Sequence, residues 1–588
     1  MRRWIMGFFA LIGILVVLFV VGGSILLSSL TSVPRRVPES AILSLDLSKE
    51  VPAAPARDPI SRLIAGEEAS LRDILDALDR GATDPRVKGV FARLGNDKLG
   101  VASIQELRGA IAAFRAKGKF AIAFADTFGE FSPGTRPYYL ASAFEQIWLQ
   151  PLGEVGLTGL RLESPYLRGT LDKLGVVPRL DHRSEYKSAM NTFTEKAMTE
   201  PEREEDQALL RSIHAQILNG IAADRHLDSS QMQGLVDAGP YLADEAARLH
   251  LVDRLGFRDE AIAAAQAKAG GTGALLRVAD YLSAAGHPNS EGPTIALIYG
   301  TGLIQRGGGG NTDIGVLGAD AASRAFREAR ADPSVRAVLF RIDSPGGSAV
   351  ASESIWREVA KTREAKIPVI ASMGNVAGSG GYFIAAGADK IVAEPATLTG
   401  SIGVVAGKLL TSGLWDKLGV GWSSLQTGGN AGMFSAIEDF SPAGEKNFET
   451  FLDAIYAGFK NRVATGRHLD QEAVERLAKG RVWSGEDAKR NGLVDELGGF
   501  DTALRLSKLA AQIDADAPVR LKRFPPEESP VEFIRGHFLG GKGEEDDTLS
   551  PIASLRQKLQ GLGTILKEFG LFLEPPGALT MRRADAVE

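Results

Sequence analysis

The feature that most constrains this chain is an internal duplication. Four short segments of its first half recur in the second half, in the same order and at nearly constant separation. The matching pairs are residues 84–91 with 332–339, 172–176 with 416–420, 225–228 with 467–470, and 251–253 with 493–495. Sequence patterns that are common in helices and strands can produce one such match by chance, but hardly four in the same order. The 588-residue chain is therefore predicted to contain two copies of one fold.

Each copy alternates short β-branched runs with helical stretches. Val87–Leu94, Val335–Ile342 and Val369–Met373 have the composition of buried strands. Leu71–Arg80 and Ser352–Arg363 have the periodicity of helices. Such alternation predicts parallel strands joined by right-handed crossovers, and hence an α/β fold in each copy.

The repeats divide the chain into four predicted parts: an N-terminal segment (1–40), a first copy (41–290), a second copy (291–510) and a tail (511–588). Within the tail, the polar and acidic stretch 540–547 is typical of a flexible linker. Beyond it, apolar residues recur at spacings of three and four, along one face of an expected helix. These are Ile552, Leu555, Leu559, Leu562, Leu566 and Phe569. We expect this helix to pack on the body or on a sister subunit, in preference to a membrane surface.

The N-terminal segment has the length and composition of a membrane anchor. No charged residue occurs from Trp4 to Pro34, and residues 5–30 are almost wholly apolar. A bilayer-spanning helix needs roughly 20 such residues, whereas a cleaved signal has an apolar run of about 7–15. Arginine pairs flank the run on both sides, and Glu39 follows the second pair. This balance favours a single span with the N-terminus inside and the body outside.

Composition excludes several classes of function. A formal net charge of −6 gives no electrostatic reason to expect a nucleic acid partner. The chain has no cysteine, which removes disulfides, thiolate metal sites and cysteine nucleophiles together. Its seven histidines show no zinc-ligand spacing. No metal, nucleotide or organic cofactor is therefore expected.

Two glycine-rich loops of the second copy carry the candidate chemistry. Residues 343–348 (Asp-Ser-Pro-Gly-Gly-Ser) follow one predicted strand, and residues 374–382 (Gly-Asn-Val-Ala-Gly-Ser-Gly-Gly-Tyr) follow the next. A serine between glycines at a strand-to-helix turn can expose its hydroxyl while neighbouring N–H groups face a substrate carbonyl. By itself such a loop is equally compatible with a close-packed turn or an anion-binding nest. Neither loop has the Gly-Lys-Ser/Thr ending of a phosphate-binding loop.

These loops, together with residues 186–189 (Tyr-Lys-Ser-Ala), resemble the signal peptide peptidase A (protease IV) family in its large, double-length form. The resemblance extends from the N-terminal segment to Ala510, and it implies a fold related to Clp protease and crotonase. It also implies a serine–lysine peptidase site with five participants. These are Ser379 as nucleophile, Lys187 as general base, Ser401 as the residue that orients the lysine, and the backbone N–H groups of Gly347 and Gly380 as oxyanion donors.

The duplication provides an independent check on that assignment. The position equivalent to Ser379 in the first copy is Thr135, which Arg136 and Pro137 follow. Since proline lacks an N–H and fixes φ, a tight glycine turn is not expected there. The position equivalent to Lys187 in the second copy is Ala431, which cannot be a base. Each copy lacks what the other keeps, so one composite site is predicted.

A lysine acts as a base only if it is buried. Its ordinary pKa lies near 10.4, so it is protonated at neutral pH unless desolvation lowers the pKa. The prediction therefore requires Lys187 in an apolar cleft, with Ser401 as a neutral partner and no carboxylate nearby. Glu185 is two residues away, and the sequence leaves open which way it points.

A serine–histidine–aspartate triad is the rival chemistry, with His182, His226 or His468 as the base. However, His226 and His468 occupy equivalent positions in the two copies, both in the context Arg-His-Leu-Asp. A residue retained in both copies of an asymmetric site is better explained by a structural role.

The resemblance also implies substrates, partners and location. It implies cleaved signal peptides and other unfolded segments as substrates, anchoring to the bilayer by the N-terminal helix, and a homo-tetramer. The expected location is the bacterial inner (cytoplasmic) membrane, with a single span and the catalytic body on the periplasmic side. Two alternatives remain open: a catalytically inactive membrane scaffold on the same fold, and a crotonase-type acyl-CoA enzyme.

Overall fold

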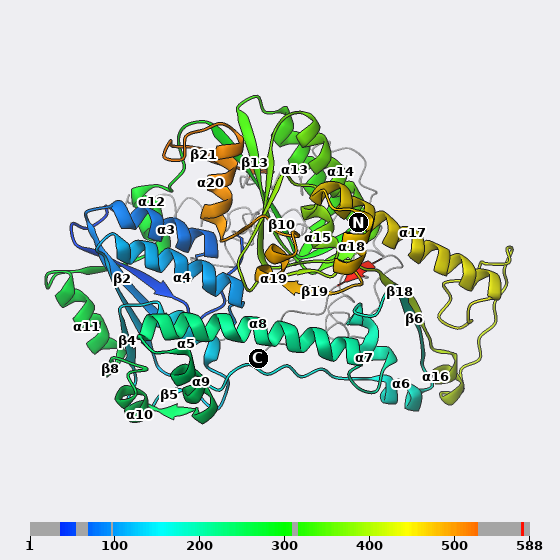
Figure 1. Cartoon of the computed structure of the whole chain (residues 1–588), viewed down its shortest axis with the longest axis horizontal. Coiled ribbons are helices and arrows are strands. Elements are labelled where there is room, and N and C mark those ends of the chain that lie inside the picture. Colours follow the sequence, from blue (N-terminus) through cyan, green and yellow to red (C-terminus); the bar gives the residue numbers. More distant parts are fainter. Residues whose placement is uncertain (1–35, 55–68, 96–97, 309–314, 527–577, 581–588) are drawn as a thin grey trace, which may run out of the picture.

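The computed structural model describes residues 36–54, 69–95, 98–308, 315–526 and 578–580. These residues form two α/β units that lie against each other, with each unit built on a largely parallel sheet (Figure 1). The predicted α/β class and its repetition are therefore confirmed.

The first sheet has the strand order β8-β4-β3-β2-β1-β9, and all its neighbouring strands are parallel. Its strands are β1 (Ala41–Asp46), β2 (Val87–Leu94), β3 (Phe120–Ala125), β4 (Gln146–Leu149), β8 (Arg254–Leu255) and β9 (Ala274–Arg277). The main helices of this half are α3 (Leu71–Thr83), α4 (Val101–Ala116), α5 (Thr135–Ser142), α8 (Glu200–Arg225), α9 (Ser229–Ala238), α10 (Ala243–Arg248), α11 (Arg258–Lys268) and α12 (Val278–Ala285). Strand β3 is buried along almost its whole length, as expected for a parallel sheet that helices cover on both faces.

The second sheet has a central order β21-β10-β13-β15, from which β15 pairs with both β16 and β17. Its strands are β10 (Thr294–Thr301), β13 (Val335–Ser344), β15 (Val369–Gly378), β16 (Lys390–Ala393), β17 (Leu398–Gly400), β19 (Val482–Ser484), β20 (Glu496–Leu497) and β21 (Arg520–Phe524). The main helices are α13 (Ala319–Ala331), α14 (Ala349–Glu364), α15 (Gly380–Ala385), α16 (Ser412–Lys417), α17 (Pro442–Arg467), α18 (Gln471–Leu477), α19 (Gly485–Arg490) and α20 (Phe500–Ala510). Because β21 pairs with β10, this sheet extends beyond the predicted boundary at residue 510.

The two sheets repeat one topology. The order β9-β1-β2-β3-β4-β8 in the first half corresponds to β21-β10-β13-β15-β16-β20 in the second. A buried tyrosine marks equivalent positions: the Tyr138 hydroxyl donates to the Leu251 carbonyl at 2.7 Å, and the Tyr382 hydroxyl donates to the Leu493 carbonyl at 2.9 Å. The repeated segments found in the sequence therefore make the same contacts in both halves.

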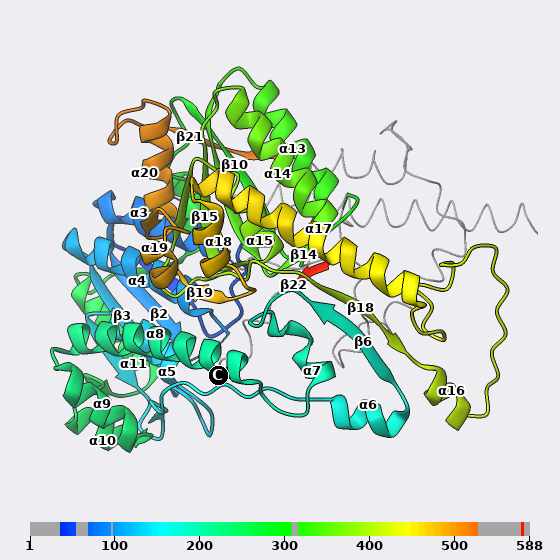
Figure 2. The same ribbon diagram turned by 45° about the vertical axis from the view of Figure 1, so that its right-hand side comes forward.

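A two-stranded ribbon joins the halves beyond the sheets. Strand β6 (Val177–His182) of the first half pairs antiparallel with β18 (Val405–Leu410) of the second, as Figure 2 shows. The short helices α6 (Arg168–Leu174) and α7 (Asn191–Thr194) flank β6 in the sequence. This ribbon carries a segment of the first half into the second, next to the glycine-rich loops.

Three predicted elements fall wholly or mostly outside the described residues. The apolar core of the predicted anchor (1–40) lies outside them, as do the acidic stretch 540–547 and the apolar series from Ile552 to Phe569. Of the helices that are described, none is long and apolar enough to cross a membrane. Strand β22 (Ala578–Thr580) is described, and it pairs antiparallel with β14 (Gly346–Ser348).

Candidate active site

Ser379 lies in the turn between β15 and α15 with a strained backbone. Its φ of 53° and ψ of −117° are unusual for a residue with a Cβ, and such strain concentrates at functional sites. Its N–H donates to the Gly400 carbonyl at 2.9 Å, and its carbonyl accepts from the Phe383 N–H, so both sides of the turn are fixed. The turn therefore holds the Ser379 hydroxyl in one place at the end of the strand.

Lys187 reaches this hydroxyl from the other half of the chain. Its Nζ lies 3.0 Å from Ser379 Oγ, 2.9 Å from Ser401 Oγ and 3.0 Å from the Ser401 carbonyl oxygen. The preceding Tyr186 N–H donates to the Lys479 carbonyl, which fixes the backbone next to the lysine. The structure thus brings together Ser379, Lys187 and Ser401, which lie far apart in the sequence.

Ser401 follows β17 and is also held in a left-handed conformation, with φ of 50°. Its N–H donates to the Arg481 carbonyl at 2.7 Å, in the loop that precedes β19. Because its hydroxyl and its carbonyl both face Nζ, Ser401 offers two neutral acceptors to the amine.

Burial brings the pKa of the Lys187 amine close to neutral pH. Lys187 is 2% exposed, and desolvation lowers its pKa to about 7, opposed in part by the charge of Glu205. Glu185 points elsewhere: its carboxylate pairs with Lys479 at 2.8 Å, and that hydrogen bond lowers the pKa of Glu185. The question that the sequence left open is thereby answered, because Glu185 pairs with a different lysine.

Glu205 is a site residue that the sequence did not identify. It is 3% exposed on α8, and its carboxylate accepts from the Val482 N–H at 3.0 Å. Burial raises its pKa to about 8, so the carboxyl is mostly neutral at pH 7. A neutral carboxyl interferes little with a neutral lysine, which reconciles an acidic residue with this site.

Two glycines make room for the lysine side chain. A Cβ added at Gly480 would lie 2.6 Å from the Lys187 Cβ and nitrogen, and one at Gly403 would lie 3.1 Å from Lys187 Cδ. The distances at Gly480 are shorter than real contacts allow and the distance at Gly403 is tighter than most, so the backbone of the second half packs directly on the lysine stem.

We expect Gly480→Ala to lower kcat by about 100-fold with little change in KM, because a shift of about 1 Å in the base costs that much. The measurement is steady-state kinetics on a fluorogenic peptide. Gly492→Ala is the matched control: Gly492 has the same left-handed φ of 79°, against 80° at Gly480, but no atom lies within 4 Å of its added Cβ. Equal kinetic losses in both variants would show that backbone strain alone is responsible.

The predicted oxyanion donors also lie together. A Cβ added at Gly380 would be 3.2 Å from the Gly347 nitrogen, so the two backbones are in close approach. Gly347 has φ of 146°, and a Cβ there would lie 2.1 Å from the Ile304 carbonyl oxygen of β11 (Leu303–Gln305). Only glycine fits at position 347. Its close approach to Gly380 places β14 beside the Ser379 turn.

In the described part of the chain, the positions equivalent to Ser379 and Lys187 in the opposite copy do not reproduce this arrangement. Thr135 begins α5, and its hydroxyl donates to the Gly159 carbonyl at 3.0 Å. Ala431 lies exposed in a turn. The asymmetry that the sequence predicted therefore appears in the structure, with one composite site between the halves.

The candidate histidines are placed for other roles. His226 and His468 end the equivalent helices α8 and α17 as left-handed caps, and their N–H groups donate to Ala222 and Ala464. His182 Nδ1 contacts the Ser184 carbonyl at 2.7 Å. Among the described contacts, none joins a histidine to Ser379, so the geometry favours lysine over a histidine triad.

Comparison with known proteins gives the same family from both halves. The family model described as Peptidase family S49 matches residues 114–271 and again residues 361–514. The chloroplastic serine protease SPPA of Arabidopsis thaliana is 30% identical over 497 residues, covering 83% of this chain and 72% of that protein. Protease 4 of Salmonella typhi is 33% identical over 450 residues, covering 74% and 71%. A putative signal peptide peptidase SppA of Enterococcus faecium is 41% identical over 179 residues, covering 30% and 52%.

The double match and the extent of these similarities lead to one conclusion: this chain belongs to peptidase family S49, and it carries two copies of the family's domain.

Proposed function

We propose that the protein is a membrane-anchored serine endopeptidase that degrades cleaved signal peptides through a Ser379–Lys187 dyad. The observation that carries the proposal is the 3.0 Å separation between Lys187 Nζ and Ser379 Oγ, across the two halves. A pKa of about 7 for the buried amine supports its role as a base at neutral pH. Membership of a peptidase family and the names of its relatives support the reaction and the substrate.

The contacts of Nζ suit a neutral amine. An amine without its extra proton has two N–H donors and one lone pair. The two donors are satisfied by the Ser401 carbonyl oxygen and hydroxyl, at 3.0 and 2.9 Å. The lone pair then accepts the Ser379 O–H, which is the step that activates the hydroxyl. Ser401 thus orients the base without adding a charge.

The proposed reaction is acyl transfer followed by hydrolysis. Ser379 Oγ attacks the peptide carbonyl while Lys187 takes its proton, and the N–H groups of Gly347 and Gly380 stabilise the oxyanion. The resulting ammonium gives that proton to the leaving amine as the peptide bond breaks. Lys187 next takes a proton from water, which attacks the acyl-enzyme, and returns that proton to Ser379 Oγ as the ester bond breaks and the second product leaves.

An extended peptide fits the edge of the site. Strand β14 contains Gly347, and its edge pairs antiparallel with residues 578–580 of the same chain (Figure 2). Strand addition of this kind supplies main-chain hydrogen bonds that do not depend on the peptide's sequence. This supports unfolded segments as substrates, since folded proteins rarely present a free strand.

The test is hydrolysis of a synthetic signal peptide in detergent, followed by mass spectrometry, with an acyl-CoA thioester as the comparison substrate. We expect internal cleavage of the peptide and no turnover of the thioester. Thioester turnover without peptide cleavage would favour the crotonase-type alternative. No turnover of either substrate, together with no labelling by a fluorophosphonate, would favour the inactive scaffold.

The pH dependence follows from the pKa of Lys187. Protonation removes the lone pair, so kcat/KM is expected to fall as the pH drops through about 7 and to level off above it. The carboxyl of Glu205 is mostly neutral at pH 7, and only its charged fraction raises the pKa of Lys187, so Glu205→Gln should move the midpoint of the profile only slightly, to lower pH. The measurement is kcat/KM between pH 5 and pH 9 on an uncharged peptide ester. A midpoint that moves upward in Glu205→Gln would contradict this electrostatic coupling.

The remaining features of the proposal concern assembly and location. We propose that residues 1–40 anchor the protein in the bacterial inner membrane with its body on the periplasmic side, and that 41–290 and 291–510 are Clp protease/crotonase-like domains. We also propose a homo-tetramer. Exposed apolar side chains in the segment after β18, namely Leu418, Trp422, Leu425 and Phe434, support self-association. Light scattering of the detergent-solubilised full chain tests the tetramer, and a monomeric mass would exclude it.

A further inference from the structure

The strand that leads to Ser379 contains a bulge in which three residues of β15 face one residue of β13. Along β13 and β15 the register pairs Ile342 with Met373, but the next pair is Ser344 with Ala377. Asp343 alone therefore faces a stretch of β15 that runs from Gly374 to Val376. In the first half, the described ladder of β2 and β3 ends at the equivalent pair, Leu94 and Ala125. The bulge is thus described in the copy that carries the serine, and bulges often re-aim a strand beside an active site.

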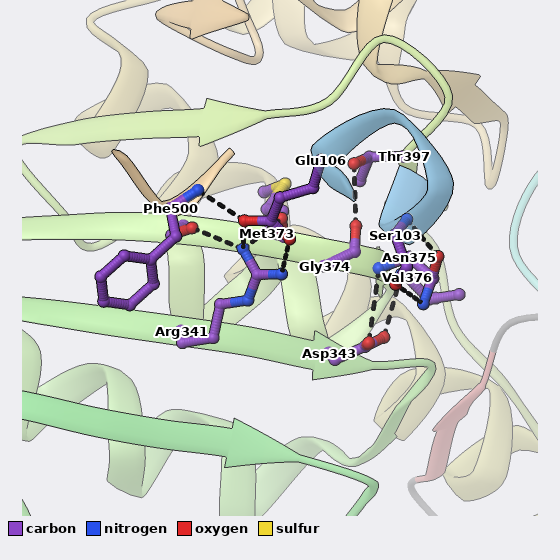
Figure 3. A network of polar contacts seen from close by, with 11 residues as sticks. Ser103, Glu106, Arg341, Asp343, Met373, Gly374, Asn375, Val376, Thr397 and Phe500 are labelled. Atoms are coloured by element: carbon purple, nitrogen blue, oxygen red, sulfur yellow. Dashed lines mark hydrogen bonds and ion pairs between the residues drawn. The ribbon is translucent and has the colours of Figure 1, made fainter. Parts of the chain in front are cut away.

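Side chains bind the backbone groups of the bulge. The Asp343 carboxylate accepts from the Val376 N–H at 3.1 Å and from the Asn375 N–H at 3.4 Å. The Thr397 hydroxyl donates to the Gly374 carbonyl at 2.8 Å (Figure 3). A Cβ at Gly374 would lie 2.6 Å from Asp343 Oδ2, so this approach requires glycine. Polar backbone groups that the ladder leaves unpaired are satisfied in this way.

The bulge redirects β15 onto a new neighbour. From Val376, the last residue of the bulge, β15 pairs with β17: Val376 pairs with Leu398, and Gly378 pairs with Gly400. The Ser379 N–H then donates to the Gly400 carbonyl. The same bulge also lies against the start of the glycine loop, where the Ser344 hydroxyl contacts the Gly346 N–H at 3.2 Å. The position of Ser379 therefore depends on the geometry of the bulge.

The first half of the chain holds the bulge through Asn375. The side-chain oxygen of Asn375 accepts from the Ser103 N–H at 3.0 Å, and its amide donates to the Ser103 hydroxyl at 2.8 Å (Figure 3). Ser103 lies in the first turn of α4, where backbone N–H groups have no partner within the helix. A Cβ at Gly100, just before α4, would lie 2.2 Å from Asn375 Oδ1, so the helix end and the bulge are in tight contact.

A second contact fixes the same helix to the same sheet. The Arg341 guanidinium of β13 donates to Glu106 of α4 at 2.6 and 3.3 Å, and both side chains are buried. Glu106 also accepts from the Phe500 N–H at 2.6 Å. This ion pair holds α4 on the sheet, whereas the Asn375–Ser103 pair is the contact that reaches the bulge itself.

We propose that Asn375 is a positioning residue, which fastens the bulge before Ser379 to helix α4 and so sets the serine against the lysine that the other half supplies. The inference rests on the proposed Ser379–Lys187 chemistry. Asn375 touches neither reacting atom, and it acts through the backbone of β15. Its loss frees the bulge from α4 while the Arg341–Glu106 pair keeps the halves together.

The test is the rate at which a fluorophosphonate labels Ser379 in the full-length protein, together with kcat and KM on a fluorogenic peptide. We expect Asn375→Ala to slow labelling and to lower kcat by about 10- to 100-fold, with KM little changed. Asp343→Asn, which leaves one acceptor for two N–H groups, should lower both rates as well.

Ser212→Ala is the matched control, since it removes a hydrogen bond between α8 and Ser484 of β19 (2.9 Å) without touching the bulge. It should keep both rates near those of the unmodified protein. Asn375→Ala rates within twofold of those of the unmodified protein would overturn the proposal, as would an equal loss in Ser212→Ala. Because labelling needs no peptide, a wrong substrate class would leave the labelling difference intact and so would be recognised separately.

Discussion

Replacing Ser379 with alanine is expected to lower kcat for peptide hydrolysis by roughly 10⁴- to 10⁶-fold. The change removes only the Oγ that lies 3.0 Å from Lys187 Nζ, and it keeps the Cβ, so the strained turn gains no new freedom. The other hydroxyl in contact with Nζ is that of Ser401, whose backbone N–H is held by the Arg481 carbonyl, so we expect no replacement nucleophile. Steady-state kinetics on a fluorogenic peptide and fluorophosphonate labelling measure the effect.

The duplication supplies the control for this variant. Thr135 occupies the equivalent position in the first half, and its hydroxyl donates to a carbonyl instead of facing an amine. Thr135→Ala should therefore leave kcat and labelling unchanged. Activity above about one tenth of the original in Ser379→Ala, or a label attached elsewhere in that variant, would mean that another group is the nucleophile.

The candidate residues came from a family resemblance, and the duplication indicated that they come from both copies. Thr135 and Ala431 lack the chemistry that Ser379 and Lys187 offer, so a meeting of the two halves was expected, and the structure places Lys187 Nζ 3.0 Å from Ser379 Oγ. The α/β class followed from strands such as Val87–Leu94, which the structure reproduces at both ends. Strong local patterns of this kind survive in the fold because burial on both faces demands continuous apolar runs.

Features that depend on side-chain direction could not be predicted in the same way. Glu205 belongs to the acid-rich stretch 202–206, and nothing in its sequence distinguishes the carboxyl that turns toward the lysine. Strand β21 has the sequence Arg-Leu-Lys-Arg-Phe and lies beyond the part of the chain that the family resemblance covers, so the predicted boundary at residue 510 left it in the tail. The bulge at Asp343 is a shift in the pairing register of β13 and β15, and the composition of the two strands does not reveal it.

Removing the amine of Lys187 should be nearly as damaging as removing the serine. We expect Lys187→Met to lower kcat/KM by about 10⁴-fold, at the upper end for loss of a general base. Methionine fills much of the volume of the buried stem between Gly403 and Gly480, so the packing of the two halves is largely kept. Fluorophosphonate labelling of Ser379 should slow in parallel, because the hydroxyl is no longer activated.

Lys187→Arg separates charge from basicity and completes the argument. A guanidinium stays protonated in proteins, so it cannot accept the Ser379 proton even if it reaches the hydroxyl. Arginine should therefore be as inactive as methionine, and activity should not return at high pH. Lys479→Met is the control: this lysine is 39% exposed, pairs with Glu185 and contributes only its carbonyl next to the site. Substantial activity in Lys187→Arg would mean that the lysine supplies a positive charge to the site, and the base would then have to be sought in another group.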